Sequence, residues 1–186
     1  MTRDDILDAA AQVFRQKGFH GASMADIAEA VKLKKASLYH HVDSKQEMLL
    51  ALLDRALGML IEQIGAVAEQ ELSADEKLRQ MILVYLKGLA DNADLASVLL
   101  FEHRSLESKQ RRKHIPQRDR FEALWRRVLE QGVQEGVFTC SDPALAVRAM
   151  MGTLNWTITW FRPSGTNSIE QIADQYAKLM LNGLRK

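Results

Sequence analysis

Hydrophobic residues recur along almost the whole chain at intervals of three and four positions, and strict apolar–polar alternation is nearly absent. Such spacing places apolar side chains on one face of an α-helix, so the pattern predicts an all-α fold. About nine helices are expected, over residues 3–17, 23–30, 34–41, 44–70, 74–92, 94–106, 117–135, 143–162 and 168–184.

Residues typical of helix ends support these boundaries. A Ser or Thr followed three positions later by an acid forms a capping box, in which each side chain bonds the other residue's backbone N–H. Such pairs are Thr2 with Asp5, Ser23 with Asp26, Ser44 with Glu47, and Ser73 with Glu76, with Ser168 and Gln171 as a weaker version. Asp142 before Pro143 predicts another start, while Gly18, Gly136 and residues 162–165 are expected to end helices.

Composition excludes few classes of protein. The chain has 186 residues, of which 47% are hydrophobic and 26% charged, as in an ordinary globular protein. Its one cysteine, Cys140, excludes an intramolecular disulfide and suits a reducing cytoplasm. The polar start of the chain does not resemble a signal peptide, and Arg148 and Asn155 interrupt the most apolar segment, 144–161. We therefore expect a cytoplasmic protein without a membrane span.

The distribution of charge is more informative than its total. Net charge is +1, and the first 55 residues hold eight Lys/Arg and eight Asp/Glu. Between Lys32 and Lys45, however, four lysines accompany one aspartate. This local basic patch coincides with two short predicted helices in residues 23–42, the layout of a helix-turn-helix whose second helix enters the DNA major groove.

The second of these helices, 34–41, has side chains suited to reading DNA. Lysines at its start can meet phosphates or guanine, a small residue lets the backbone approach, and hydroxyl groups can bond base edges. The candidates are Lys34, Lys35, Ala36, Ser37 and Tyr39, with Lys45 as a phosphate contact at the next helix start. On spacing alone, a solvated helical hairpin with a few lysines is an equally good interpretation.

Residues 3–55 resemble the DNA-binding domain of the TetR family of bacterial regulators. The resemblance is carried by Ile6, Ala9, Ala10, Phe14, Gly18, Ile27, Ala28, Leu38-Tyr39-His40-His41-Val42 and Lys45. It implies a recognition helix at 34–41 and phosphate contacts near Ser23, Tyr39, His40 and Lys45. Lys32 departs from the family's usual glycine, and it is expected either to strain the turn, if that residue needs a positive φ, or to add a phosphate contact. Val42 departs from the commoner phenylalanine, a mild change of volume.

The C-terminal part resembles the family in architecture, and its penultimate helix carries two apolar stripes. Val147, Met151, Leu154 and Ile158 form one, and Leu145, Ala149, Gly152 and Trp156 form the other. A helix that is apolar on both sides is buried on both, so one stripe can face its own core and the other a partner subunit. The resemblance implies a C2 dimer built as a four-helix bundle, and a palindromic operator. We expect the interface to use Val147, Met151, Leu154, Ile158, Ile172, Tyr176 and Leu179.

A basic run beside apolar positions suggests the class of effector. Residues 104–127 hold nine Lys/Arg against three acids. An anionic head with an apolar tail, such as an acyl-CoA or a fatty or aromatic acid, would suit this stretch. The segment 155–163 is similar to acyl-CoA-responsive members of the family. The candidate ligand residues are Arg104, Arg118, Phe121, Trp125, Asn155 and Trp156. The alternative is that the basic run is solvated and the tryptophans belong to the dimer core.

No pattern in the chain favours an enzyme. Phosphate-binding glycine loops, metal-ligand spacings and nucleophile elbows are absent from the sequence, and we expect no catalytic residue, cofactor or metal. We expect a ligand-responsive repressor with a DNA-binding domain at residues 1–46, a ligand-binding and dimerisation domain at 47–186, and helix 44–70 as the link between them. The alternative is a helical adaptor of the same fold that does not read DNA.

Overall fold

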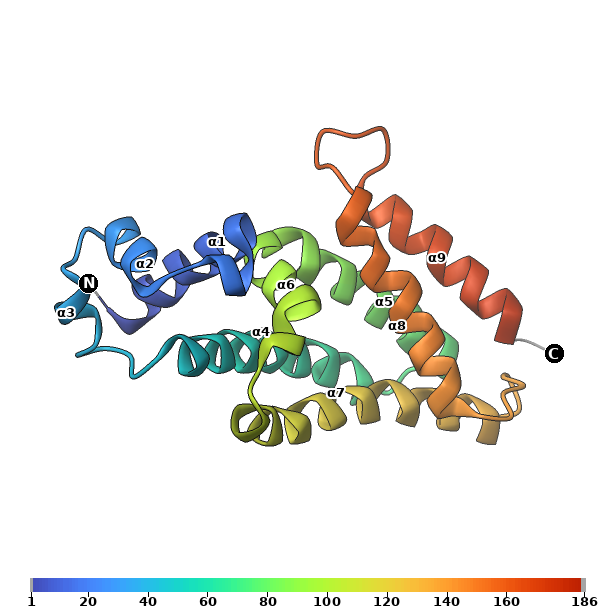
Figure 1. Ribbon diagram of the computed structural model, residues 1–186. Helices are drawn as coiled ribbons and strands as arrows, with labels where there is room; N and C mark the ends of the chain where they lie inside the picture. Colours follow the sequence, from blue (N-terminus) through green and yellow to red (C-terminus); the bar gives the residue numbers. More distant parts are fainter. Residues whose placement is uncertain (1, 185–186) are drawn as a thin grey trace. The chain divides into compact units, whose positions relative to one another are not determined.

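A computed structural model describes residues 2–184, and every regular element in that range is helical (Figure 1). The elements are α1 (Arg3–Gly21), α2 (Met24–Ala30), α3 (Lys35–Leu38), α4 (Lys45–Ala68), α5 (Ala74–Asp91), α6 (Ala93–Ser97), the π-helical turn η1 (Val98–Glu102), the 3₁₀ turn η2 (His103–Ser105), α7 (Ser108–Gln134), α8 (Pro143–Trp160) and α9 (Ile169–Leu184). The prediction of an all-α fold is confirmed.

Most helix starts follow from the capping residues in the sequence. Thr2 and Ser23 each form a full capping box with the acid three positions later. Asp142 accepts a hydrogen bond from the backbone N–H of Leu145 at 3.0 Å, one turn into α8. Ser168 does the same for Gln171 at the start of α9. These side chains satisfy backbone N–H groups that have no partner inside the helix.

Several predicted boundaries were wrong. The helix predicted over 3–17 runs to Gly21, and the one predicted over 34–41 is confined to Lys35–Leu38. Two other differences are larger. The single helix expected over 94–106 is split into α6, η1 and η2. The π-helical turn η1 adds one residue to a helical turn, which leaves the apolar spacing almost unchanged, so the periodicity did not reveal the split. The helix expected from 117 begins at Ser108 and carries Pro116 in its interior. Proline removes one backbone hydrogen bond there. The helix nevertheless continues, because Gln110 and His114 on its first turns are buried against α4.

The described chain forms two compact units. One contains the residues up to Gly58 together with Asn92–Gln117, and the other contains Met59–Asp91 together with the residues from Arg118 onward. Helices α4 and α7 each contribute their first part to the first unit and their second part to the other.

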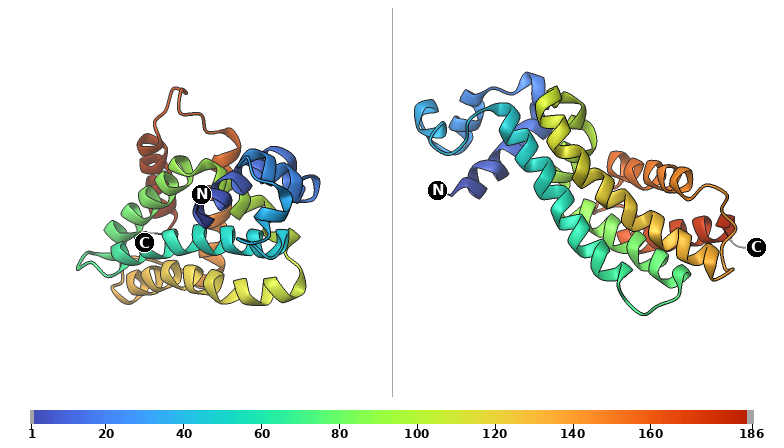
Figure 2. Two further views of the ribbon diagram at one scale, coloured as in Figure 1. Left: turned by 90° about the vertical axis from the view of Figure 1, so that its left-hand side faces the viewer. Right: turned by 90° about the horizontal axis from the view of Figure 1, so that it is seen from below.

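In the first unit, α2 packs on α1 and α3, and α6 and η1 lie against α1. Its wholly buried side chains include Ile6, Phe14, Ile27, Leu38, Met48 and Leu49. In the second unit, α5 packs against α8 and α9 (Figure 2). Its wholly buried side chains include Ile64, Leu78, Met81, Trp125, Val147 and Leu154.

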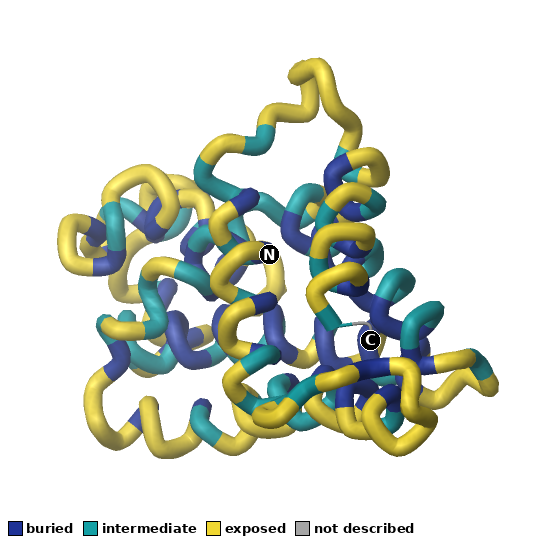
Figure 3. The backbone as a smooth tube through the Cα atoms, turned by 90° about the vertical axis from the view of Figure 1, so that its right-hand side faces the viewer, coloured by how far each residue is buried: buried dark blue, intermediate teal, exposed yellow. Residues whose placement is uncertain are grey.

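The connection between α8 and α9 is exposed throughout residues 162–168, the loop at the top of Figure 3. Among residues 2–184, none of the helices combines the length and apolar character that a membrane span requires. The same residues contain no group of three or more His, Cys, Asp or Glu side chains placed to hold a metal ion.

Candidate functional site

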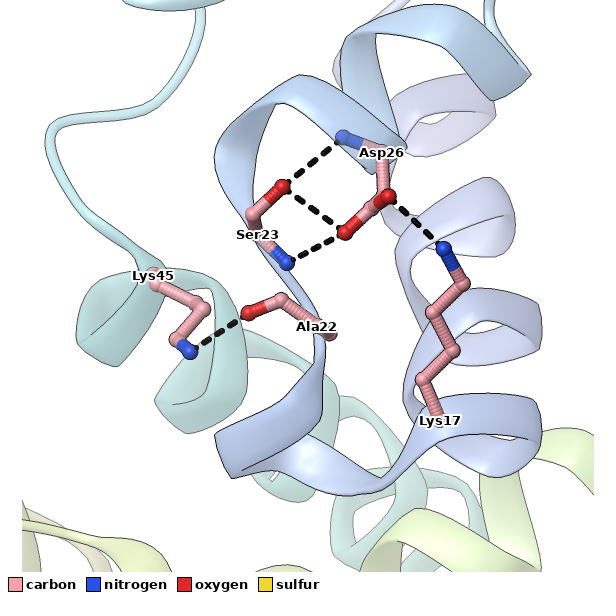
Figure 4. A network of polar contacts seen from close by, with 5 residues as sticks. All are labelled: Lys17, Ala22, Ser23, Asp26 and Lys45. Carbon is pink, nitrogen blue, oxygen red and sulfur yellow. Dashed lines mark hydrogen bonds and ion pairs between the residues drawn. The ribbon is translucent and has the colours of Figure 1, made fainter.

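A polar network at the start of α2 joins this helix to α1 and α4 (Figure 4). α1 is interrupted at Gly18, whose φ of 69° and ψ of 159° are open to glycine because it lacks a Cβ. Ser23 then caps α2: its Oγ accepts from the N–H of Asp26 at 3.1 Å, and the carboxylate of Asp26 accepts from the N–H of Ser23 at 2.7 Å. A hydrogen bond from Lys17 and others from Ser23 lower the pKa of Asp26 to about 2. Asp26 is therefore ionised at neutral pH and fixes the orientation of α2.

The turn between α2 and α3 has a left-handed residue at Lys32. The backbone N–H of Lys32 donates to the carbonyl of Glu29 at 3.0 Å, and that of Leu33 donates to the carbonyl of Ala28 at 2.8 Å. This pattern closes a helix when the residue after its C-cap has a positive φ. Lys32 has a φ of 54° and is the one non-glycine residue with a positive φ among residues 2–184. The strain predicted at this departure from glycine is present.

Residues 34–40, which we call the recognition segment, are anchored by one apolar residue and expose most of their polar ones. Leu38 of α3 is wholly buried. Around it Tyr39 keeps 46% of its surface exposed. Lys34, Lys35, Ala36 and His40 are also exposed, and Ser37 is half-buried. Six of the eight predicted DNA contacts therefore lie on one short solvent-facing segment, which leads directly into α4.

The other two predicted contacts have internal partners. The hydroxyl group of Ser23 belongs to the capping box of α2. The ammonium group of Lys45 donates to the carbonyl oxygens of Phe19 and Ala22, each at 2.7 Å. Phosphate contacts at these two positions stay predictions. The capping role of Ser23 was predicted from the sequence, whereas the internal contacts of Lys45 were not.

The two stripes of α8 have opposite environments, and one predicted assignment is corrected. Val147 and Leu154, expected at a dimer interface, are wholly buried within their own unit, so their side chains are out of reach of a partner. Met151, Ile158 and Tyr176 are half-buried, and Ile172 is buried. The second stripe is the exposed one: Leu145, Ala149, Gly152, Trp156 and Trp160. We call these five residues the α8 stripe.

The α8 stripe is unusually apolar for a solvent-facing surface. Leu145 is 61% exposed and Trp156 is 66% exposed. Leu179, a predicted interface residue on α9 of the same unit, is also 66% exposed. Scattered apolar residues on a surface need no explanation, but a contiguous row along one helix marks a contact surface.

The second unit contains an aromatic cluster with polar groups inside it. Tyr85 of α5 contacts Phe121 and Trp125 of α7, with ring centroids 5.7 and 5.8 Å apart. The hydroxyl group of Tyr85 donates to Oδ1 of Asn155 on α8 at 2.5 Å. Burial raises the pKa of Tyr85, so the hydroxyl group stays protonated. Among the described residues, the indole Nε1 of Trp125 and the hydroxyl group of Thr157 are buried without a hydrogen-bond partner.

This cluster contains three of the six predicted ligand residues: Phe121, Trp125 and Asn155. Trp156 is outside this cluster, since its side chain is exposed on the α8 stripe, and a ligand contact there stays a prediction. Arg118 is exposed and pairs with Asp119 at 3.3 Å, and Arg104 is exposed in the first unit. Tyr85 and Thr157 were not predicted as ligand residues, because neither follows a local sequence motif.

The structure thus contains a helix-turn-helix with an exposed polar recognition segment, together with a separate helical unit that has a polar group buried in an aromatic core. This combination defines a DNA-binding protein with an effector-type domain. Residues 6–52 match the domain of "Bacterial regulatory proteins, tetR family", and residues 71–184 match the "Tetracyclin repressor-like, C-terminal domain". The chain belongs to the TetR family, and it is a DNA-binding transcriptional regulator.

Several regulators are similar to this chain over nearly the whole of both proteins. The HTH-type transcriptional repressor KstR2 of Rhodococcus jostii is 29% identical over 98% of this chain and 90% of its own. The regulator PfmR of Thermus thermophilus is 38% identical, with a TM-score of 0.87 over 97% of this chain and 99% of PfmR. AibR, solved in complex with isovaleryl coenzyme A and operator DNA, is 26% identical, with a TM-score of 0.88 over 95% of this chain and 96% of AibR.

Proposed function

We propose that the chain is a dimeric repressor that binds a palindromic operator and releases it when an apolar anion, most simply an acyl-CoA, binds the second unit. The observation that carries the DNA-binding part is the exposed segment from Lys34 to His40, anchored by buried Leu38. Residues 1–46 would form the DNA-binding domain, and residues 47–186 would form the ligand-binding and dimerisation domain. The protein would act in the cytoplasm as a binding switch, without a catalytic step.

The proposed effector class is supported by the two sides of α7 in the second unit. Its buried side presents Phe121 and Trp125 to the aromatic cluster, and its exposed side carries arginines. The first environment matches an acyl chain in its apolar chemistry, and the second matches the phosphates of coenzyme A in its charge. The unpaired Trp125 N–H can only donate, so it needs an acceptor such as a thioester carbonyl. AibR binds isovaleryl coenzyme A, which makes this compound the first probe.

A path from effector to DNA runs through α4 and α7, which both extend into both units. In the first unit, the amide group of Gln46 donates to the carbonyl of Ser105 at 2.9 Å and accepts from the N–H of Glu107 at 3.0 Å. Further along, His114 Nδ1 lies 2.9 Å from Asp54 Oδ1. A movement of α7 would therefore be passed to the first turns of α4. A hundredfold change in operator affinity requires about 2.7 kcal/mol of effector preference for one state.

Replacing Tyr39 with alanine tests the recognition segment. We expect operator affinity to fall about tenfold or more, because one contact to a base edge contributes about 1–3 kcal/mol. The operator is first selected from a random duplex pool, in which an enriched palindrome is expected, and affinity is then measured by titration. Phe101→Ala is the matched control, because Phe101 is another exposed aromatic residue of the first unit. Equal affinities of Tyr39→Ala and the wild type would refute the assigned surface.

Thermal shift tests the effector class. Isovaleryl-CoA should raise the melting temperature, since a ligand at 100 times its Kd stabilises the folded state by about 2.7 kcal/mol. Free CoA and isovalerate, tested alone, should shift it less. In the variant Trp125→Phe, which keeps an aromatic ring but loses the N–H donor, binding should weaken about tenfold. If no acyl-CoA raises the melting temperature at millimolar concentration, the proposed effector class is wrong.

A further inference from the structure

Lys45 occupies a point where three helices of the first unit meet. It is the first residue of α4, and its ammonium group donates to the carbonyl of Phe19, near the end of α1, at 2.7 Å. It also donates to the carbonyl of Ala22, the residue directly before the cap of α2, at 2.7 Å (Figure 4). The same group lies 4.4 Å from the ring centroid of Phe19, where a cation is attracted to the aromatic face.

These contacts give hydrogen-bond partners to carbonyl groups at the end of a helix. The last carbonyl groups of a helix have no partner inside it, and a lysine from another element can supply one. Phe19 lies in the last turn of α1 and Ala22 is its C-cap, so the carbonyl groups of both residues lie at the helix end. One ammonium group therefore joins the end of α1, the entry to α2 and the start of α4. The recognition segment lies between α2 and α4 in the chain, so its position depends on both.

We propose that Lys45 is a positioning residue for operator recognition: it sets the orientation of the recognition segment through the carbonyls of Phe19 and Ala22, rather than by neutralising a phosphate. Two of its three N–H donors bond carbonyl groups inside the protein, and the ammonium group lies over the ring of Phe19. This inference rests on the function proposed above, in which the segment from Lys34 to His40 reads DNA.

The two roles differ in how binding responds to salt. Each phosphate neutralised by a lysine releases counterions, so removing such a contact flattens the salt dependence of log K by about one unit and weakens binding to any duplex. Loss of a positioning residue leaves the salt dependence and the affinity for an unrelated duplex unchanged. It weakens specific binding alone, because the base-reading side chains no longer meet their base edges together.

The test compares Lys45→Met with Lys35→Met and the wild type. Methionine keeps an apolar side chain over Phe19 but removes the ammonium group. Affinities for the selected operator and for an unrelated duplex are measured over a series of salt concentrations, well below the melting temperature of each variant. For Lys45→Met we expect operator affinity to fall about tenfold, equivalent to about 1.4 kcal/mol, with an unchanged salt slope and unchanged non-specific affinity. For Lys35→Met, an exposed lysine of α3, we expect a flatter slope and weaker binding to both duplexes.

A flatter slope and equal losses on both duplexes for Lys45→Met would overturn the proposal in favour of a phosphate contact. A lower melting temperature with unchanged operator affinity would overturn it in favour of a purely structural role. If the variant does not fold, the wild-type ammonium group is observed by nitrogen-15 NMR in the absence of DNA. Slow proton exchange at Lys45 Nζ is then expected, and rapid exchange would contradict the proposal. Failure of the wild type to select any operator would instead refute the proposed function.

Discussion

Replacing Trp156 with glutamate is expected to separate the dimer and to lower operator affinity at least a hundredfold. The indole ring is 66% exposed on the α8 stripe, and a tryptophan buried by an interface commonly contributes about 2 kcal/mol or more. A carboxylate in its place would also have to be buried without a partner. Two DNA-binding domains joined in one dimer bind the operator about 10²–10⁴ times more tightly than one domain alone. Separate protomers lose this gain. Sedimentation equilibrium and operator titration measure the two effects.

The matched control for this variant is Val133→Glu. It makes the same apolar-to-acidic change at another exposed position of the second unit, but on α7 and outside the α8 stripe. It should remain dimeric and bind the operator as the wild type does. A Trp156→Glu protein that sediments as a dimer at micromolar concentration would place the interface on another surface.

Replacing Gly132 with alanine is expected to destabilise the protein by about 3 kcal/mol, at the upper end of the usual overpacking cost. A Cβ atom at position 132 would lie 2.1 Å from Cδ2 of Phe138, whose ring is buried against the glycine. The ring cannot move away easily, because the N–H groups of Val137 and Phe138 both donate to the carbonyl of Gly132 at 3.0 Å. Urea unfolding at one fixed protein concentration gives the change in the free energy of unfolding.

Gly65→Ala serves as the control for this measurement. Gly65 lies in the same unit on α4, and a Cβ there would meet nothing within 4 Å. Alanine is favoured over glycine in a helix, so this variant should gain about 0.5–1 kcal/mol. If Gly132→Ala unfolds at the same urea concentration as the wild type, the close packing of Phe138 on α7 is contradicted.

Local features of the fold could be predicted because they depend on residues close together in the chain. Ser23 and Asp26 fix the start of α2 within four positions, and Gly18 marks the break in α1. Pro116 misled the prediction of α7, because contacts of Gln110 and His114 with α4 outweigh a local helix breaker. On α8 the periodicity showed two apolar stripes. It could not show which stripe is internal, since that depends on where α5 packs.

The candidate sites divide in the same way. The DNA-facing residues are contiguous from Lys34 to His40, so their pattern is visible in the sequence. The aromatic cluster combines Tyr85, Phe121 and Asn155 from three helices, and the hydrogen bond from Tyr85 to Asn155 depends on how those helices are aligned. Sequence reasoning treated Lys45 as a free charge, because its carbonyl partners belong to backbone groups more than twenty positions away.

The left-handed lysine between α2 and α3 has a consequence for engineering. Holding a residue with a Cβ in that conformation costs about 1–2 kcal/mol, and glycine would avoid the cost. Selection for heat resistance alone should therefore favour glycine at position 32. Selection for promoter occupancy should retain lysine wherever its exposed charge, next to the recognition segment, adds to the attraction for the DNA backbone. Position 32 therefore affects folding stability and DNA affinity in opposite directions. A regulator optimised for stability is expected to lose some of its affinity for DNA.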